Sequence, residues 1–291
     1  MSPIDIIWDM ETNDPDDFLT LCFFAAHPRV NLRAVTVMPG SDAQVGIVRR
    51  ALHLLGQGHI PVGSCSPGYE KNVVSEFHYQ FLGDVPRAKA DGVGHEVIMD
   101  TLRKFPRATL VTGAPLKTFR PIATELVLER WIAQGGFAGD SVVPEEYRLD
   151  KFKGRETCPT FNFNGDPKTA LAMLGSPKIR EVFCVSKNVC HGVVYDGEFH
   201  QRVARVANRN AGLEMIYRAM EVYLKHQPEG KLLHDPLAAC VALDQSVCEF
   251  REVEVYRERG EWGSRLSSGT GRFISVRHDA QKFFKLFTAQ I

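Results

Sequence analysis

The sequence lacks an excess of either charge: it holds 35 basic and 35 acidic residues among 291, with no lysine- or arginine-rich block. This balance leaves no electrostatic footprint for a nucleic acid or an anionic membrane surface, so we expect neither as a partner. There is also no charged and apolar leader, and no apolar run long enough to span a membrane. We therefore expect a cytoplasmic protein whose ligand is a small neutral molecule.

Cysteine pairs with metal-type spacing are also lacking. The seven cysteines are odd in number, scattered and mostly embedded in apolar runs, which predicts reduced core thiols. No internal repeat, low-complexity segment or linker-like stretch divides the chain. Because 44% of the residues are hydrophobic, the chain can bury a sizeable core, and we expect a single domain over residues 1–291.

Apolar runs and amphipathic stretches alternate through most of the sequence, which predicts an α/β fold with a mostly parallel open sheet and helices on both faces. Strands are expected at 4–8, 31–38, 60–63, 108–113 and 181–186, and helices from Phe18 onward and at 45–55, 116–127 and 166–174. The segments 64–92 and 135–165 are too long to be simple connections. We expect them to form walls of a functional site.

Five carboxylates stand within nine residues directly after the first expected strand, in Asp9-Met10-Glu11-Thr12-Asn13-Asp14-Pro15-Asp16-Asp17. Carboxylates this close repel one another, so a fold that holds them at one strand end needs a compensating cation. An oxygen-only set suits Ca²⁺ or Mg²⁺ better than zinc. The alternative is a solvated loop whose acids favour the start of a helix.

A second short motif, His234-Asp235-Pro236, stands more than two hundred residues later. Together with the acidic stretch it resembles the inosine-uridine nucleoside hydrolase family, and further matches follow in the family's order. They are Ala34-Val35-Thr36-Val37 with Gly40, Ile60-Pro61-Val62, Asp91-Gly92-Val93-Gly94, Thr112-Gly113-Ala114-Pro115-Leu116, Gly135-Gly136, Phe161-Asn162 with Asp166-Pro167, and Leu233-His234-Asp235-Pro236-Leu237-Ala238.

The resemblance implies a Ca²⁺ ion at the carboxyl edge of the sheet, Ca-dependent hydrolysis of the N-glycosidic bond of a ribonucleoside, and a homodimer or homotetramer. It implies roles for named positions. The metal ligands would be Asp9, Glu11, Asp17, Asp235 and the main-chain carbonyl of Lys117; Asp16 and Asn162 would bind the ribose; His234 would protonate the departing base. Glu11 is our first candidate for the base that activates water, and Asp9 the second.

Three substrate-binding positions depart from the family's pattern: Ser41 stands for an Asn, Gly154 for another ribose-binding Asn, and Thr160 for a Glu that binds the sugar 5′-hydroxyl. Losing a buried partner for a substrate hydroxyl changes discrimination strongly, so a modified nucleoside is a further expectation. A 5′ substituent could fill the space beside Thr160, assisted by Lys153 or Arg155.

Two alternatives remain open at this point. The strand followed by Asp9-Met10-Glu11-Thr12 is similar to the start of a haloacid dehalogenase-type phosphatase, in which Asp9 would be the nucleophile. The substitutions at Ser41, Gly154 and Thr160 would also suit a nucleoside-binding protein without turnover.

Overall fold

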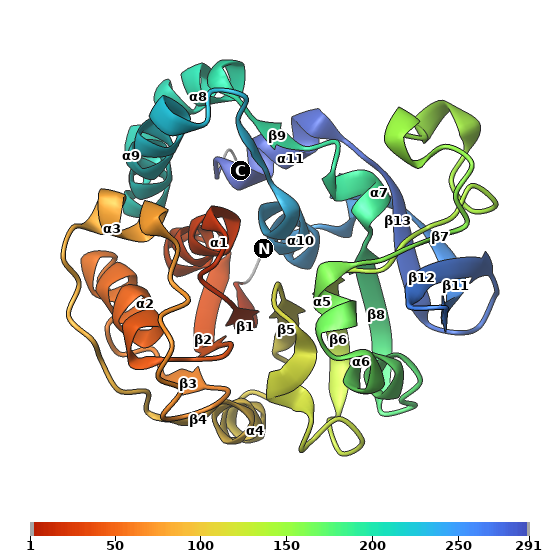
Figure 1. The fold of residues 1–291 in the computed structure, drawn as a ribbon, viewed down its shortest axis with the longest axis horizontal. Coiled ribbons are helices and arrows are strands. Elements are labelled where there is room, and N and C mark those ends of the chain that lie inside the picture. Colours follow the sequence, from red (N-terminus) through yellow and green to blue (C-terminus); the bar gives the residue numbers. More distant parts are fainter. Residues whose placement is uncertain (1–2, 290–291) are drawn as a thin grey trace.

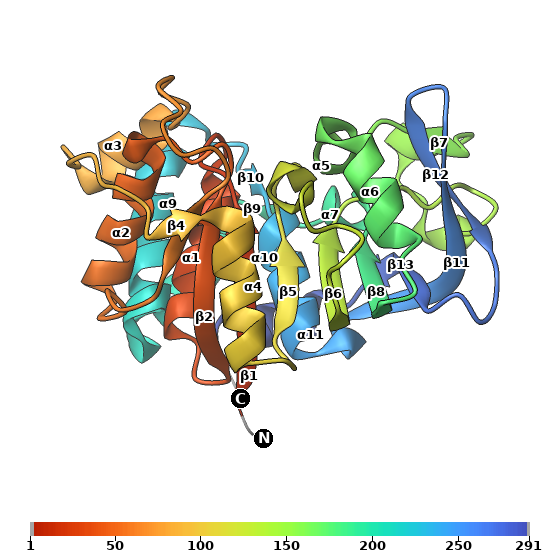
Figure 2. The same ribbon diagram turned by 90° about the horizontal axis from the view of Figure 1, so that it is seen from below.

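An eleven-stranded mixed sheet forms the centre of the molecule, and helices cover both of its faces (Figures 1 and 2). The computed structural model describes residues 3–289. The strand order is β4 (Gly92–Val93), β3 (Val62–Ser64), β2 (Val30–Val37), β1 (Ile4–Met10), β5 (Thr109–Thr112), β6 (Leu128–Gln134), β8 (Ile179–Val185), β13 (Arg272–His278), β11 (Cys248–Glu258), β12 (Glu261–Leu266) and β7 (Thr157–Cys158). Neighbours are parallel from β4 to β13 and antiparallel beyond it, so the predicted fold class is confirmed.

Alternate residues of β1 face two different hydrophobic cores, as the period of a strand requires. Ile6, Trp8 and Met10 pack into one core with helices α1 (Pro15–Ala26), α2 (Asp42–Leu54), α9 (Ala211–His226), α10 (His234–Leu243) and α11 (Ala280–Phe287). Ile7 packs into the other core with α4 (Gly94–Lys104) and α6 (Pro167–Leu174). Figure 2 shows α4 and α6 on one face of the sheet and α10 and α11 on the other.

The acidic stretch turns directly from β1 into α1. Asp14 caps the helix by accepting from the Asp16 N–H, and Pro15 takes the first helical position, where a missing N–H costs nothing. The helix therefore begins three residues before Phe18, where we expected it. As a result Asp16 and Asp17 lie in its first turn, at the carboxyl end of β1.

The prediction of a helix at 116–127 is wrong. The chain forms only the short 3-10 turn η1 (Leu116–Phe119) and then further turns. Pro121 explains the difference, because it has no N–H to donate to the Lys117 carbonyl and would clash within a continuing helix.

The two long segments carry short elements of their own. Segment 64–92 contains α3 (Glu76–Leu82). Segment 135–165 contains two 3-10 turns, η2 (Glu145–Tyr147) and η3 (Asp150–Phe152), then β7 and α5 (Phe161–Gly165). The remaining elements are α7 (Lys187–Cys190), α8 (Gly197–Ala204), the 3-10 turns η4 (Ala207–Arg209) and η5 (Gln245–Val247), and the small pair β9 (Val194–Tyr195) and β10 (Lys231–Leu232).

All seven cysteines are free thiols, and six of them are buried; Cys65 is half-buried. The prediction of unpaired core thiols is confirmed for those six. Within residues 3–289, no helix has both the length and the apolar character needed to cross a membrane.

Candidate active site

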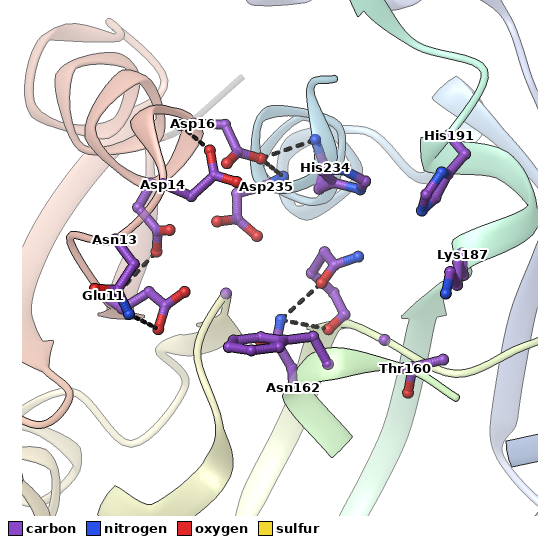
Figure 3. A pocket seen from close by; sticks show the side chains of 15 residues that line it. Glu11, Asn13, Asp14, Asp16, Thr160, Asn162, Lys187, His191, His234 and Asp235 are labelled. Carbon is purple, nitrogen blue, oxygen red and sulfur yellow. Dashed lines mark hydrogen bonds between the residues drawn. The ribbon is translucent and has the colours of Figure 1, made fainter. Parts of the chain in front are cut away.

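A cavity of about 370 Å³ opens at the carboxyl edge of the sheet, where β1, β5 and β6 end and α1, α5, α7 and α10 begin. Its two ends differ in chemistry (Figure 3). One end is acidic, and the other carries neutral and basic side chains. The lining residues are Glu11, Asn13, Asp14, Asp16, Asp17, Gly113, Gln134, Gly135, Thr160, Phe161, Asn162, Lys187, His191, His234 and Asp235.

The acidic end brings together Asp16, Asp17 and Asp235, whose carboxylate oxygens lie within 4.8 Å of one another. All three residues are buried. Burial raises the pKa of Asp17 and of Asp235 well above the ordinary range, and neighbouring carboxylates raise both further. A cluster of buried like charges is stable only if it is protonated or compensated by a cation, and its donors are all oxygen. The residues present therefore fit a hard divalent cation such as Ca²⁺ or Mg²⁺.

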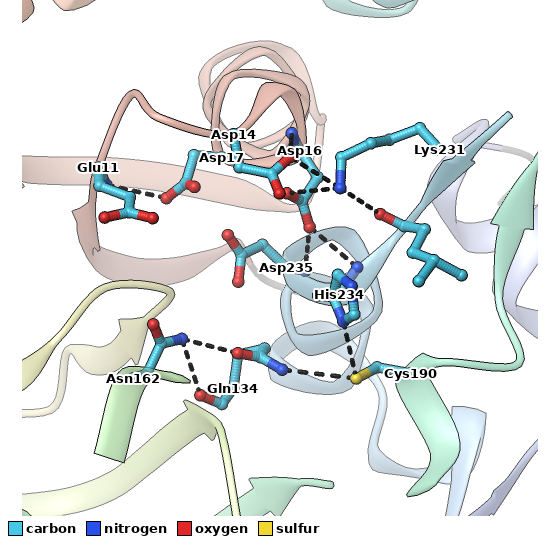
Figure 4. Close-up of polar contacts among 11 residues, drawn as sticks. Glu11, Asp14, Asp16, Asp17, Gln134, Asn162, Cys190, Lys231, His234 and Asp235 are labelled. Carbon is cyan, nitrogen blue, oxygen red and sulfur yellow. Dashed lines mark hydrogen bonds and ion pairs between the residues drawn. The ribbon is translucent and has the colours of Figure 1, made fainter. Parts of the chain in front are cut away.

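Asp16 is held by three groups from the other end of the chain (Figure 4). Its Oδ2 accepts hydrogen bonds from the backbone N–H of His234 at 2.9 Å and of Asp235 at 3.0 Å. The ammonium of Lys231 lies 3.4 Å from its Oδ1 and 2.7 Å from Oδ1 of Asp14. These contacts join the first turns of α1 and α10. Sequence reasoning missed Lys231. A single lysine three residues before the His-Asp motif gives no reason to expect such a contact.

Glu11 and Asp9 occupy different places. Glu11 lines the cavity, its N–H donates to Asp17 Oδ1 at 2.9 Å, and burial followed by the charge of Asp14 raises its pKa to about 7. Asp9 lies on the Ile7 face of β1, outside the lining residues, and accepts from Thr36 Oγ1 at 2.5 Å. Its buried Oδ2 has no partner among the described residues, and burial raises its pKa to about 7.

Ser41 and Lys117 lie outside this cavity. Ser41 caps α2 in a capping box with Gln44, so its side chain is already engaged. Lys117 lines a second cavity of about 610 Å³, which shares Glu11, Asn13 and Phe161 with the first. The substrate role of Ser41 and the ligand role of the Lys117 carbonyl stay predictions.

A chain of side-chain hydrogen bonds connects the sugar-binding candidate Asn162 with His234 (Figure 4). Asn162 Nδ2 donates to Gln134 Oε1 at 2.6 Å, and Gln134 Nε2 donates to Cys190 Sγ at 3.4 Å. Cys190 Sγ in turn lies 3.0 Å from His234 Nδ1. Burial lowers the pKa of His234 to about 4 and raises that of Cys190 to about 12, so both are neutral at pH 7. Sequence reasoning missed Gln134 and Cys190, because neither stands in a motif.

Two glycines lining the cavity allow neighbouring side chains to approach the backbone closely. A Cβ on Gly113 would lie 2.6 Å from Asp235 Cγ and 2.4 Å from the Trp8 ring. One on Gly135 would lie 2.7 Å from the Phe163 ring. Both positions thus need glycine for close approach.

Phe163 anchors the segment that carries Thr160 and Asn162. Its ring packs edge-on against Trp262 at 5.1 Å and near Trp131 at 6.3 Å, and Trp262 Nε1 donates to Asn164 Oδ1 at 2.9 Å. Both tryptophans are fully buried, so they belong to the core and do not line the cavity.

Thr160 lines the cavity, and its buried Oγ1 has no hydrogen-bond partner among the described residues. The two cations that we expected beside it lie elsewhere. Lys153 pairs with the exposed Asp150 at 2.6 Å, and neither Lys153 nor Arg155 is among the lining residues.

The profile of the family described as "Inosine-uridine preferring nucleoside hydrolase" matches residues 6–285. A search of curated proteins found no match. Similar solved structures include a plant nucleoside hydrolase (18% identity, 98% of each chain covered, TM-score 0.72) and a purine-preferring ribonucleoside hydrolase from Gardnerella vaginalis (16%, 98% and 97%, 0.69). A further one is an inosine-uridine preferring nucleoside hydrolase from Bacillus anthracis (15%, 99% and 100%, 0.70). These likenesses show that the fold is shared over the whole chain.

Proposed function

The chain belongs to the inosine-uridine preferring nucleoside hydrolase family, and from this premise we propose that it is a Ca²⁺-dependent enzyme acting on a ribonucleoside or a modified nucleoside. Family membership makes it an N-ribosyl hydrolase, which cleaves the N-glycosidic bond of nucleosides. The observation that carries the metal dependence is the buried cluster of Asp16, Asp17 and Asp235.

In this proposal Asp17 and Asp235 hold the cation, with Glu11 beside them; Asp9 and the Lys117 carbonyl remain weaker candidates, since both lie outside the cavity lining. Ca²⁺, when bound, would supply a Lewis acid that polarises water and orients the vicinal ribose hydroxyls. Asp16, fixed by Lys231 and by two backbone N–H groups, accepts a hydrogen bond from a ribose hydroxyl. Asn162 binds the sugar from the facing wall.

Cleavage of the ribosyl C–N bond passes through an oxocarbenium-like sugar, which needs a deprotonated water on one face and a proton for the departing base. We assign proton removal to the Glu11 carboxylate, because Glu11 lies at the acidic end of the cavity and its backbone N–H donates to Asp17. His234 faces the leaving base: its Nδ1 faces Cys190, and its Nε2–H is left to donate a hydrogen bond to the departing nitrogen. Because a neutral ring does not give up this proton, the base takes its proton from solvent. Ser41 has its hydroxyl engaged in the α2 cap and is the weakest of the substrate-binding candidates, whereas Thr160 lines the cavity.

We further propose that the protein acts in the cytoplasm as a single domain and assembles as a homodimer or homotetramer, with no nucleic acid partner. The balanced charge and the family resemblance support these points.

An assay for three products separates this proposal from its alternatives. Incubation with purine and pyrimidine nucleosides and their monophosphates should release free base, and a chelator should abolish the release. Inorganic phosphate without base would favour a phosphatase, and neither product would favour a binding protein.

Asp17→Asn and Asp235→Asn test the location of the metal. Each should lose Ca²⁺ binding in calorimetry and lower base release by at least about a hundredfold, since each removes a charged oxygen from the cluster. Asp42→Asn is the matched control, because Asp42 follows β2 at the same edge but pairs with Lys89 outside the cavity. Stoichiometric Ca²⁺ in both site variants would place the metal elsewhere.

A further inference from the structure

The end of the cavity opposite the acidic cluster has no ligand assigned to it. Lys187 and His191 face the cavity there, with Thr160 beside Lys187 (Figure 3). The five lining carboxylates, those of Glu11, Asp14, Asp16, Asp17 and Asp235, all stand at the other end (Figures 3 and 4). The pocket is therefore polarised along its length, with negative side chains at one end and a positive one at the other.

Lys187 is a cation without a carboxylate partner among the described residues. Its Nζ donates to the Pro159 carbonyl at 2.9 Å, which uses one of three ammonium protons. Lys231 differs, because Asp14 at the acidic end neutralises it. The remaining protons of Lys187 are free for a group inside the cavity.

His191 presents a second donor at the same end. Lys151 Nζ contacts its Nδ1, and because an ammonium can only donate, Nδ1 is the acceptor and the ring proton of the neutral form sits on Nε2. The ring is held edge-on against Phe152 at 5.4 Å and against His234 at 4.9 Å. Burial, then the charges of His234 and nearby lysines, lower its pKa to about 3, in keeping with a neutral ring.

We propose that Lys187 and His191 form an anion subsite, and that the substrate is a nucleoside carrying a phosphate or carboxylate distant from its ribose diol. The inference rests on the proposed function, because that function places the ribose diol at the acidic end. The part of the substrate most distant from the diol then lies at the opposite end of the cavity, beside Lys187. It revises our expectation of a neutral ligand. It also replaces Lys153 and Arg155 by two residues that line the cavity.

The two sources of such an anion are a 5′-phosphate and a carboxylated base, and three substrates distinguish them. kcat/KM is measured for uridine, uridine 5′-monophosphate and orotidine with the Ca²⁺-loaded enzyme. One of the two anionic substrates should exceed uridine by about tenfold or more, and which one it is identifies the source.

Lys187→Met should lower kcat/KM for the preferred anionic substrate by about tenfold to a hundredfold, the usual effect of one charge-assisted hydrogen bond. The same variant should change uridine turnover by less than about threefold, and Lys187→Arg should keep most of the preference. Lys153→Met is the control, and it should change none of the three values. An equal loss on charged and neutral substrates would show that Lys187 only supports the Pro159 segment and would overturn the proposal.

Binding without turnover separates this proposal from the hydrolase assignment. Calorimetry compares ribose 5-phosphate with ribose, and orotate with uracil, on the wild type and on Lys187→Met. The proposal predicts that one anion binds at least about tenfold more tightly than its neutral partner, and only while Lys187 is present. Equal affinities within both pairs would overturn the subsite even if base is released. A Lys187-dependent preference without base release from any substrate would keep the subsite and overturn the hydrolase function.

Discussion

His234 reaches the cavity with one ring nitrogen already committed. Cys190 Sγ lies 3.0 Å from its Nδ1, and the thiol also accepts a hydrogen bond from Gln134. A neutral thiol that donates to Nδ1 keeps the imidazole proton on Nε2, the nitrogen left for the departing base. Cys190 is thus a positioning residue, which acts through His234 and touches no reacting atom.

Replacement of Cys190 tests this tautomer directly. Cys190→Ser keeps a donor to Nδ1 and should retain kcat within about threefold, whereas Cys190→Ala should lower kcat by about tenfold with little change in KM. The ¹⁵N chemical shifts of His234 should report the Nε2–H form in the wild type and the serine variant, and a tautomer mixture in the alanine variant. Identical ring shifts in all three proteins would contradict the assignment.

The carboxyl end of β5 and the start of α10 fit together only because residue 113 is glycine. A Cβ there would meet both Trp8 of β1 and Asp235 of α10. The φ angle of Gly113 lies outside the left-handed region, so an alanine would act through its volume alone. The contact between the end of β5 and the start of α10 therefore sets the position of Asp235, one of the proposed metal ligands.

Gly113→Ala should weaken Ca²⁺ binding by at least about tenfold, because Asp235 must move away from the added methyl group. Overpacking should also cost about 1–3 kcal/mol of folding free energy. Gly197→Ala is the control, since nothing lies within 4 Å of a Cβ at this first residue of α8. Calorimetry and thermal melting with and without Ca²⁺ measure both effects, and an unchanged Ca²⁺ affinity would contradict this packing argument.

Patterns local in sequence predicted five of the eleven strands, β1, β2, β3, β5 and β8, because apolar alternation and strand-end motifs depend only on neighbouring residues. They did not select the other six, among them β6 and the antiparallel strands β11 and β12. The prediction of a helix at 116–127 failed because Pro121 interrupts it. The spacing of apolar residues alone does not take account of a proline. Gln134, Cys190 and Lys231 could not be selected, since their contacts depend on which strands and helices become neighbours. By contrast the meeting of Asp17 and Asp235 was expected, because the resemblance of their two motifs to the nucleoside hydrolase family implied it.

Stability of the whole molecule should depend on pH through buried histidines outside the cavity. His78 of α3 packs edge-on against Phe18 and Phe77, and burial lowers its pKa to about 4. A histidine whose folded pKa lies below its unfolded value binds fewer protons when folded, so stability is lost as pH falls between about 6.5 and 4. The raised pKa values of four buried carboxyls act with the opposite sign and favour the folded state at low pH; they are those of Asp9, Glu11, Asp17 and Asp235.

His78→Leu should remove this part of the acid sensitivity. Between pH 7.5 and pH 5 the wild type should lose roughly 2 kcal/mol more of its free energy of unfolding than the variant. Because both proteins carry the same acidic cluster, the comparison cancels its contribution. The exposed His59→Leu is the control and should follow the wild type. Equal losses in the wild type and His78→Leu, measured by urea denaturation, would contradict the prediction.

The central claim is that this pocket transfers a ribosyl group to water, and the balance of products tests it most directly. The account predicts that free base and free ribosyl sugar form in equal amounts in phosphate-free buffer, that added phosphate changes neither yield nor rate, and that chelation stops both. A phosphate requirement with ribose 1-phosphate as the product would contradict it.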